Sequence, residues 1–206
     1  MRIVASRIAT GMNAINSIPV PPHPPLMPAD VWPALADPRH RRLLRHWAEA
    51  RGSSLMAPRA AIDPAALRDC LHFMWINRWD VTRQDFVCTL AGEGVIDAWG
   101  VNIIGRTATE VMGPELGLRL NLRYRAALGI PAVQFGHRII VPPDVTQKQS
   151  TRLVLPLSDD TGAPYGVLGL TLYDYALPEH GGPEVAPGQE MELYACAGLP
   201  RTLPPG

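Results

Sequence analysis

The chain has little of what several classes of protein require. It contains three cysteines, Cys70, Cys88 and Cys196, and no two of them have the spacing of a metal-binding pair. An odd number of cysteines also argues against a disulfide framework. We therefore expect buried free thiols in a protein that works in a reducing compartment.

An excess of charge of one sign is also absent, because 19 basic residues balance 19 acidic ones. This gives no electrostatic reason to expect nucleic acid or an anionic membrane as a partner. No apolar run approaches the roughly 20 residues that span a bilayer. The N-terminal region lacks the hydrophobic block and small-residue cleavage site of a secretory signal. We expect a cytoplasmic protein.

Prolines are abundant, and their positions suggest where the domain begins and ends. Many of the 22 prolines lie before residue 37 or after residue 176. Proline-rich stretches do not form regular helix or sheet interiors. We predict a proline-rich N-terminal lead-in over residues 1–36, one domain over 37–176, and a proline- and glycine-rich C-terminal tail over 177–206.

An amphipathic helix is predicted over residues 37–51. Asp37 is a favoured N-cap, proline follows it at the first helical position, and Gly52 comes after the last periodic residue. The apolar residues on one face are Leu43, Leu44, Trp47 and Ala50. This face must be buried against the protein's own sheet or against a second copy. We expect a homodimer in which Leu43, Leu44 and Trp47 contribute to the contact.

Five strands are predicted in the remainder of the domain. Residues 73–80 and 85–90 form a hairpin, and residues 133–141, 151–157 and 165–173 form three further strands, the last two joined by a polar turn. Between these groups lie short helical turns over 92–112 and a helix from Pro114 that ends at Gly129. This order is typical of an α+β domain with an antiparallel sheet.

Three groups of residues occur one after another along the chain. The first comprises Trp47, Arg51-Gly52, Pro58-Arg59, Asp63-Pro64, Leu67 and Leu71. The second comprises Leu90-Ala91-Gly92, Gly100, Asn102 and Gly105. The third comprises Leu155-Pro156-Leu157, the polar turn over 159–162, and Val167-Leu168-Gly169.

The element order resembles the PAS sensor fold, and the three groups are similar to a bacterial PAS subfamily of small stand-alone proteins. The resemblance covers residues 40–175 and departs at Glu93, where a small hydroxyl residue is expected. It implies a five-stranded antiparallel sheet with helices on one face and an N-terminal helical extension. It also implies a ligand cavity between sheet and helices, with signals leaving through the sheet and the flanking helices.

The cavity is expected to be apolar and modest in size. Its candidate lining residues share an apolar strand parity or helix face, and they are Cys88, Leu90, Trp99, Ile103, Leu120, Tyr124, Phe135 and His137. His137 has the strand parity of Phe135, so it either is a satisfied core histidine or hydrogen-bonds a ligand. Trp75 and Trp79 give the first strand an aromatic face, which fits core packing or a partner-binding surface.

Cofactor and metal motifs are missing. His72 and His137 are available as axial ligands, but there is no C-x-x-C-H haem motif, and no reactive-cysteine flavin motif surrounds Asn102 or Cys88. The six histidines are never paired at metal-ligand spacing. Asp159-Asp160 precedes Thr161-Gly162 and reads as a solvated turn. We expect no haem, flavin or metal.

The sequence therefore predicts a stand-alone sensory or adaptor domain in bacterial signal transduction. It has no recognisable output module, so we expect it to bind a small molecule, a signalling partner protein, or both, and not to be an enzyme. The alternative is a small α+β enzyme that uses a cavity His137 with a carboxylate for acid–base chemistry.

Overall fold

The computed structural model describes residues 25–27, 30–140, 148–174, 191–200 and 202–204. Its centre is an antiparallel sheet in the order β5-β6-β7-β3-β4. These strands are β3 (Met74–Asp80), β4 (Asp85–Ala91), β5 (Ala132–Ile140), β6 (Lys148–Ser158) and β7 (Pro164–Asp174). The predicted α+β class with five antiparallel strands is confirmed, and so is each predicted hairpin.

Short strands extend this sheet. Beyond β5 lie β8 (Glu192–Ala195), antiparallel to β5, and β1 (Leu26–Met27), parallel to β8. The short strand β2 (Ala57–Pro58) pairs with β6. The C-terminal segment, predicted to be a tail, thus adds a strand and buries Leu199 and Leu203 in the core. The lead-in likewise adds β1 and buries Val31 and Leu35, because apolar side chains within proline-rich stretches still gain from burial.

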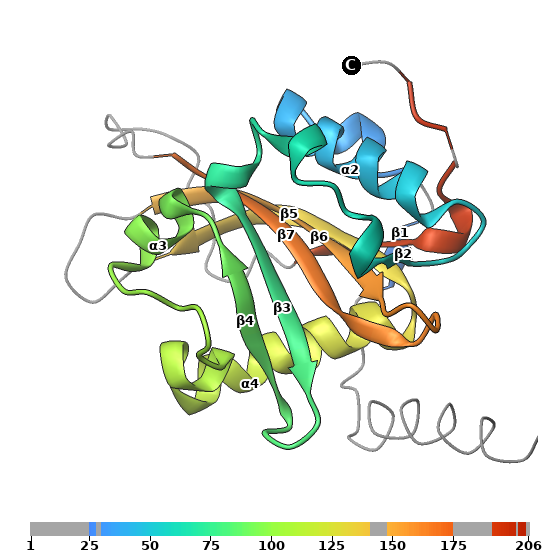
Figure 1. Cartoon of the computed structure of the whole chain (residues 1–206). Helices are drawn as coiled ribbons and strands as arrows, with labels where there is room; N and C mark the ends of the chain where they lie inside the picture. The colour runs from blue at the N-terminus through green and yellow to red at the C-terminus, as the bar shows by residue number, and fades with distance from the viewer. Residues whose placement is uncertain (1–24, 28–29, 141–147, 175–190, 201, 205–206) are drawn as a thin grey trace, which may run out of the picture.

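Helices cover both faces of the sheet (Figure 1). Helix α2 (Pro38–Arg51) lies on one face, next to the short 3₁₀ turns η1 (Trp32–Ala34), η2 (Arg59–Ala61), η3 (Ala65–Leu67) and η4 (Leu71–Phe73). Helices α3 (Glu93–Trp99) and α4 (Ala108–Gly129) belong to the opposite face, and the turn η5 (Cys196–Gly198) follows β8. The implied arrangement, one helical face plus an N-terminal extension, is observed.

Helix α2 packs on its own sheet. Asp37 caps it by accepting a hydrogen bond from the Arg39 backbone N at 2.8 Å. Leu43, Leu44 and Trp47 are fully buried, and the Trp47 indole Nε1 donates to the Pro156 carbonyl at 2.9 Å. The prediction that these three side chains contact a second copy is therefore wrong. The sheet supplies enough apolar surface to bury the whole stripe within one chain.

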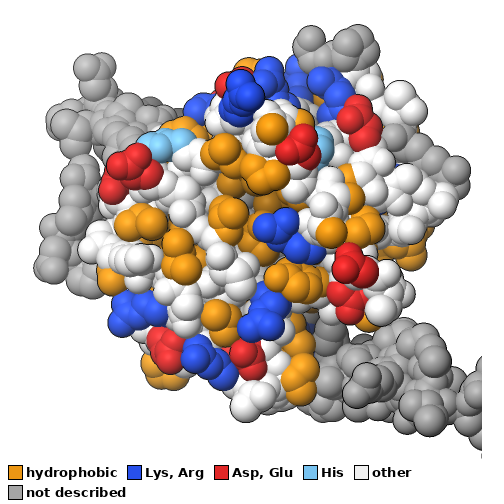
Figure 2. All heavy atoms as spheres, in the orientation of Figure 1, with side chains coloured by type: hydrophobic (Ala, Val, Ile, Leu, Met, Phe, Trp, Pro, Cys, Tyr) orange, Lys and Arg blue, Asp and Glu red, His pale blue; other side chains and the backbone are white. Residues whose placement is uncertain are grey.

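The opposite side of α2 is polar. Figure 2 shows Lys and Arg side chains gathered at the top of the molecule, where α2 lies. Arg42 forms an exposed ion pair with Asp69, and Arg41 and Arg45 lie over the Trp32 ring at 5.6 and 5.4 Å from its centroid. Arg41 and Arg45 thus cover the Trp32 ring by cation–π contact, and their guanidinium groups donate to the Leu35 and Pro204 carbonyls.

Helix α4 is longer than predicted and is broken near its N-terminal end. It begins at Ala108 behind a capping box made by Thr107 and Glu110. Gly113 interrupts it with φ 79° and ψ 169°. Pro114 explains the break, because proline disfavours helical geometry in the residue before it and cannot donate a backbone hydrogen bond. The predicted start at Pro114 is the start of the second half of this helix.

Two glycines of the recognised motifs are required by close packing. A Cβ on Gly92 would lie 2.1 Å from the Leu71 carbonyl oxygen. A Cβ on Gly169 would lie 2.0 Å from the Trp75 indole. Any side chain at either position would have to displace backbone or a buried ring, so these motif positions are determined by sterics.

His40 makes stability depend on pH. It lies in the first turn of α2 and is buried, with its ring edge-on to Phe135 at a centroid distance of 5.5 Å. Burial lowers the pKa of its imidazole from 6.5 to about 4. Between pH 6.5 and pH 4 the imidazole is therefore protonated in the unfolded chain but neutral in the folded chain. The contribution of His40 to the free energy of unfolding is complete above pH 6.5 and is lost as the pH falls towards 4.

Between pH 7 and pH 5 we expect this group to lower the free energy of unfolding by roughly 2 kcal/mol. Urea unfolding of the wild type and of His40→Gln at both pH values measures it. His40→Gln should lose less stability on acidification by that amount, whereas His72→Gln, at an exposed histidine, should behave as the wild type does. Equal losses in the wild type and His40→Gln would contradict this assignment.

Among the described residues, no helix combines the length and apolar character needed to cross a membrane.

Candidate functional site

A small cavity lies between the sheet and the helices α3 and α4. Its volume is about 50 Å³, which is room for a few water molecules or one very small organic molecule. The residues that line it come from β3, β4, β6, β7, α3, α4 and the loop 100–107, and they are Trp75, Asn77, Cys88, Val95, Trp99, Ile103, Arg106, Thr107, Ala108, Val111, Met112, Leu120, Tyr124, Arg152 and Tyr173.

The loop 100–107, here named the rim loop, holds one side of the cavity against the edge strand β4. The Cys88 backbone N donates to the Arg106 carbonyl at 3.0 Å, and the Gly105 N donates to the Cys88 carbonyl at 2.8 Å. An isolated bridge joins Val87 to Thr107. Gly100 and Gly105 have φ of 66° and 81°, so the sharp turns at both ends of this loop favour glycine.

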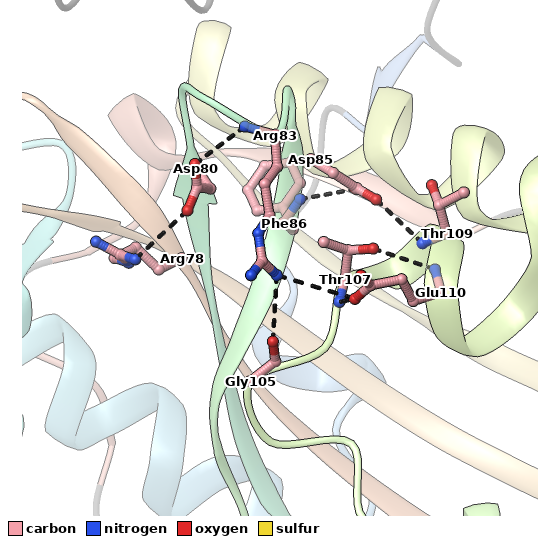
Figure 3. Close-up of polar contacts among 9 residues, drawn as sticks. All are labelled: Arg78, Asp80, Arg83, Asp85, Phe86, Gly105, Thr107, Thr109 and Glu110. Atoms are coloured by element: carbon pink, nitrogen blue, oxygen red, sulfur yellow. Dashed lines mark hydrogen bonds and ion pairs between the residues drawn. The ribbon is translucent and has the colours of Figure 1, made fainter.

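Polar contacts at the β3–β4 turn fix the end of the rim loop and the start of α4 (Figure 3). The carboxylate of Asp85 is buried and accepts from the Thr109 backbone N at 3.0 Å and from the Asn121 side chain at 3.1 Å. Arg83 donates to the Gly105 carbonyl at 3.3 Å and lies 3.9 Å from the Glu110 carboxylate. Asp85 therefore ties β4 to both halves of the broken helix.

Aromatic and aliphatic side chains form most of the cavity wall. Trp75 is buried and lies tilted against Tyr124 with ring centroids 5.6 Å apart. Its indole Nε1 donates to the Thr171 hydroxyl at 2.9 Å. Trp75 and Trp79 both pack in this core, so their aromatic face is a core surface, as one of the two sequence interpretations predicted.

One buried cation faces this apolar wall. Arg152, on β6, is 5% exposed, and its guanidinium carbon lies 5.7 Å from the Trp75 ring centroid. Its Nε donates to the Thr171 hydroxyl at 3.1 Å. Neither of its terminal nitrogens makes a hydrogen bond or ion pair with a described residue. No described residue that lines the cavity is acidic.

Five of the eight predicted cavity residues do line the cavity, and they are Cys88, Trp99, Ile103, Leu120 and Tyr124. Leu90, Phe135 and His137 do not. Leu90 and Phe135 pack in the core under α2, on the other face of the sheet. His137 shares the face of Phe135, with ring centroids 6.1 Å apart, and it is exposed.

Two physical features explain the misplaced residues. A bulge shifts the β3–β4 register so that Ile76 pairs with Leu90 but Asn77 pairs with Cys88. The extra residue, Thr89, reverses the parity of Leu90. Phe135 and His137 lie on the α2 face of β5. That face is as apolar as the cavity face, so the alternation of residues along the strand could not show which of the two faces they occupy.

The proposed acid–base pair is not formed in this cavity. His137 lies on the opposite face, and it has no hydrogen bond or ion pair to a carboxylate in the described part of the chain. Burial raises the pKa of the Cys88 thiol to about 11, so this cavity thiol is protonated at neutral pH. Glu93, the departure from the motif, is exposed at the start of α3 and is not among the lining residues.

The predicted cysteines and the predicted polar turn are also observed. Cys70, Cys88 and Cys196 are all buried and free. Asp159 sits in the predicted solvated turn, where it accepts from the Thr161 and Ala163 backbone N groups. Within the described ranges, no group of three or more His, Cys, Asp or Glu side chains could hold a metal ion.

Sequence reasoning missed Arg152, Asn77 and Trp75 as cavity residues. A signal for Arg152 was present, because it is a single cation within the apolar alternation of residues 151–157. A strand buried on both faces is normally a near-continuous apolar run. A charged residue in such a run indicates a buried partner or a ligand.

Comparisons with known proteins give structural matches only. No protein-family model and no curated protein matches the sequence. Among solved structures, the PAS domain of BvgS from Bordetella pertussis matches with a TM-score of 0.41 and 15% identity, covering 50% of this chain and 76% of that one. The PAS domain of a Colwellia psychrerythraea protein matches with a TM-score of 0.39 and 12% identity, covering 53% of this chain and 96% of that one. Neither match identifies a ligand or partner for this chain.

Proposed function

We propose that this chain is a sensory domain of bacterial signal transduction that binds a small molecule in the cavity and relays its presence to a partner protein. The observation that carries the proposal is the cavity itself, which is bordered by four strands of the sheet, by α3 and α4, and by the rim loop. A cavity lined mostly by apolar side chains with a few polar groups is the usual form of a ligand site.

The elements around the cavity are suited to respond to a ligand. The rim loop is joined to β4 by two backbone hydrogen bonds and one bridge. The first half of α4 is separated from the second by the break at Gly113. Because the cavity holds only a few waters' volume, a larger ligand that lay wholly inside it would have to move these elements outward. Such a displacement is a conformational change that differs between the free and bound states.

A route to the opposite face exists through β6. Arg152 faces the cavity, and four residues further along, the Pro156 carbonyl accepts the hydrogen bond from Trp47 of α2. A shift of β6 caused by a ligand would therefore reach α2 and its arginine-rich outer surface. We propose that this surface, or the sheet edge beside it, contacts the partner protein.

The test is a screen of small neutral and charged fragments by ligand-observed NMR against the wild type and two variants. Val111→Phe fills the cavity from α4, and Leu118→Phe adds the same ring at a position of α4 that is 55% exposed. We expect at least one fragment to bind the wild type and Leu118→Phe equally and Val111→Phe at least about tenfold more weakly.

Hydrogen exchange gives the second measurement in this test. The bound fragment should change the exchange rates of rim-loop and α3 amides more than those of the β5–β6 pair. If no fragment binds, or if every fragment binds Val111→Phe as well as the wild type, the cavity is a packing void and the proposed function is wrong.

A further inference from the structure

We infer that the cavity selects small organic carboxylates, and that Arg152 is the residue that binds the carboxylate group. The inference rests on the proposed function and names the chemical class of its ligand. It starts from a cation that is 95% buried and has no acidic partner among the described residues.

A buried guanidinium without a counter-charge is costly to maintain. Arg152 has two compensating contacts, the Thr171 hydroxyl at 3.1 Å and the face of Trp75 at 5.7 Å. Neither contact neutralises its charge. A charge transferred from water into a protein interior loses favourable hydration unless it is paired. An anion in the cavity would supply the missing charge.

The geometry of the contacts leaves the binding edge of the guanidinium available. Nε is occupied by Thr171, and the Trp75 ring lies against the guanidinium. The two terminal nitrogens, which form a fork that matches the two oxygens of a carboxylate, make no hydrogen bond with a described residue. Since Arg152 lines the cavity, a carboxylate there would be bound by this fork.

Asn77 and Arg106 add further hydrogen-bond donors to the same cavity. The Asn77 amide makes no hydrogen bond with a described residue, and it is half-buried. Arg106 is exposed and lies on the rim loop. The three groups carry hydrogen-bond donors, and two of them are cationic. They give an acid a strong preference over its neutral amide.

The remaining walls explain why the anion should be organic. Trp99, Ile103 and Leu120 offer apolar contact that an inorganic oxyanion could not use. The cavity of about 50 Å³ sets the size of the enclosed part of the ligand, since only a carboxylate with a very short hydrocarbon chain would lie wholly inside it. Acetate and propionate are therefore the probes that match the cavity as it stands.

The test compares propionate with propionamide, which has nearly the same shape and no charge. NMR titrations of the wild type should show propionate binding about 30-fold more tightly than propionamide. Nitrate, which has planar oxygens without a hydrocarbon chain, should bind at least about tenfold more weakly than propionate.

Three variants assign the preference to Arg152. Arg152→Met keeps a flexible stem against Trp75 and should lose about 30-fold in propionate affinity, with propionamide unchanged. Arg152→Lys keeps the charge and should retain the preference for acid over amide, which provides the test if Arg152→Met does not fold. Arg119→Met, at an exposed arginine of α4, should bind as the wild type does.

Equal affinity of the wild type for propionate and propionamide would overturn the inference. So would propionate binding that is unaffected by Arg152→Met, or nitrate binding as tightly as propionate. In each of these cases the fragment screen with Val111→Phe still decides the proposed function separately, because that screen counts neutral ligands as well as acids.

Discussion

Replacing Trp47 with alanine is expected to lower the free energy of unfolding by about 3–5 kcal/mol. The side chain is fully buried between α2 and the sheet, so its removal leaves a large cavity in the core. The variant also leaves the Pro156 carbonyl without the indole donor that now lies 2.9 Å away, and an unsatisfied buried acceptor adds to the cost.

Urea unfolding followed by circular dichroism measures this loss, with Trp47→Phe as the matched control. Phenylalanine keeps an aromatic ring in the site and removes only the N–H donor and part of the volume, so its loss should be clearly smaller. If Trp47→Ala instead kept wild-type stability and shifted the protein from dimer to monomer in sedimentation, the packing of α2 on its own sheet would be contradicted.

Replacing Asp85 with alanine is expected to lower the free energy of unfolding by about 3 kcal/mol. Its buried carboxylate accepts hydrogen bonds from the Phe86 and Thr109 backbone N groups and from the Asn121 side chain, at 2.7, 3.0 and 3.1 Å. Hydrogen bonds to a charged acceptor are stronger than neutral ones, and alanine would leave buried donors unsatisfied.

The effect of Asp85→Ala should also be local in space. Hydrogen exchange of the first turns of α4 and of the rim loop should accelerate more than that of α2, because Asp85 joins β4 to both halves of α4. Asp160→Ala removes an exposed carboxylate from the other hairpin turn and should change stability by no more than about 0.5 kcal/mol. A loss of that small size for Asp85→Ala would show that its hydrogen bonds do not hold the helix.

The cavity and the α2 face share the strand β6, which links the candidate site to the rest of the molecule. Arg152 and Val154 face the cavity side, whereas Leu153 and Leu155 pack in the core under α2. Along a strand, alternate side chains point to opposite faces. A ligand contact at Arg152 and the packing of Trp47 are therefore separated by only the thickness of one sheet.

The sequence by itself determined the five main strands, helix α2 and their order, but not β1, β2 or β8. The Asp37-Pro38 start and the Gly52 stop of α2, the turn at residues 81–84 and the turn at residues 159–162 are all local signals, and the structure has each of them where predicted. Such features depend on capping side chains, on the fixed φ of proline and on glycine conformations, which act within a few residues. Five of the eight cavity residues predicted from helix and strand periodicity do line the cavity, but they are only part of its lining.

Only the tertiary structure decided which face of the sheet each residue occupies and what lies against it. The bulge beside Asn77 places Leu90 on the α2 face. Phe135 and His137 also lie on the α2 face, away from the cavity. Both faces of the sheet are apolar, so periodicity gives two equivalent answers. Likewise, the apolar stripe that contains Trp47 fits packing on its own sheet and packing on a second copy equally well. Contacts with residues distant in sequence, Pro156 and the core, place Trp47 on its own sheet.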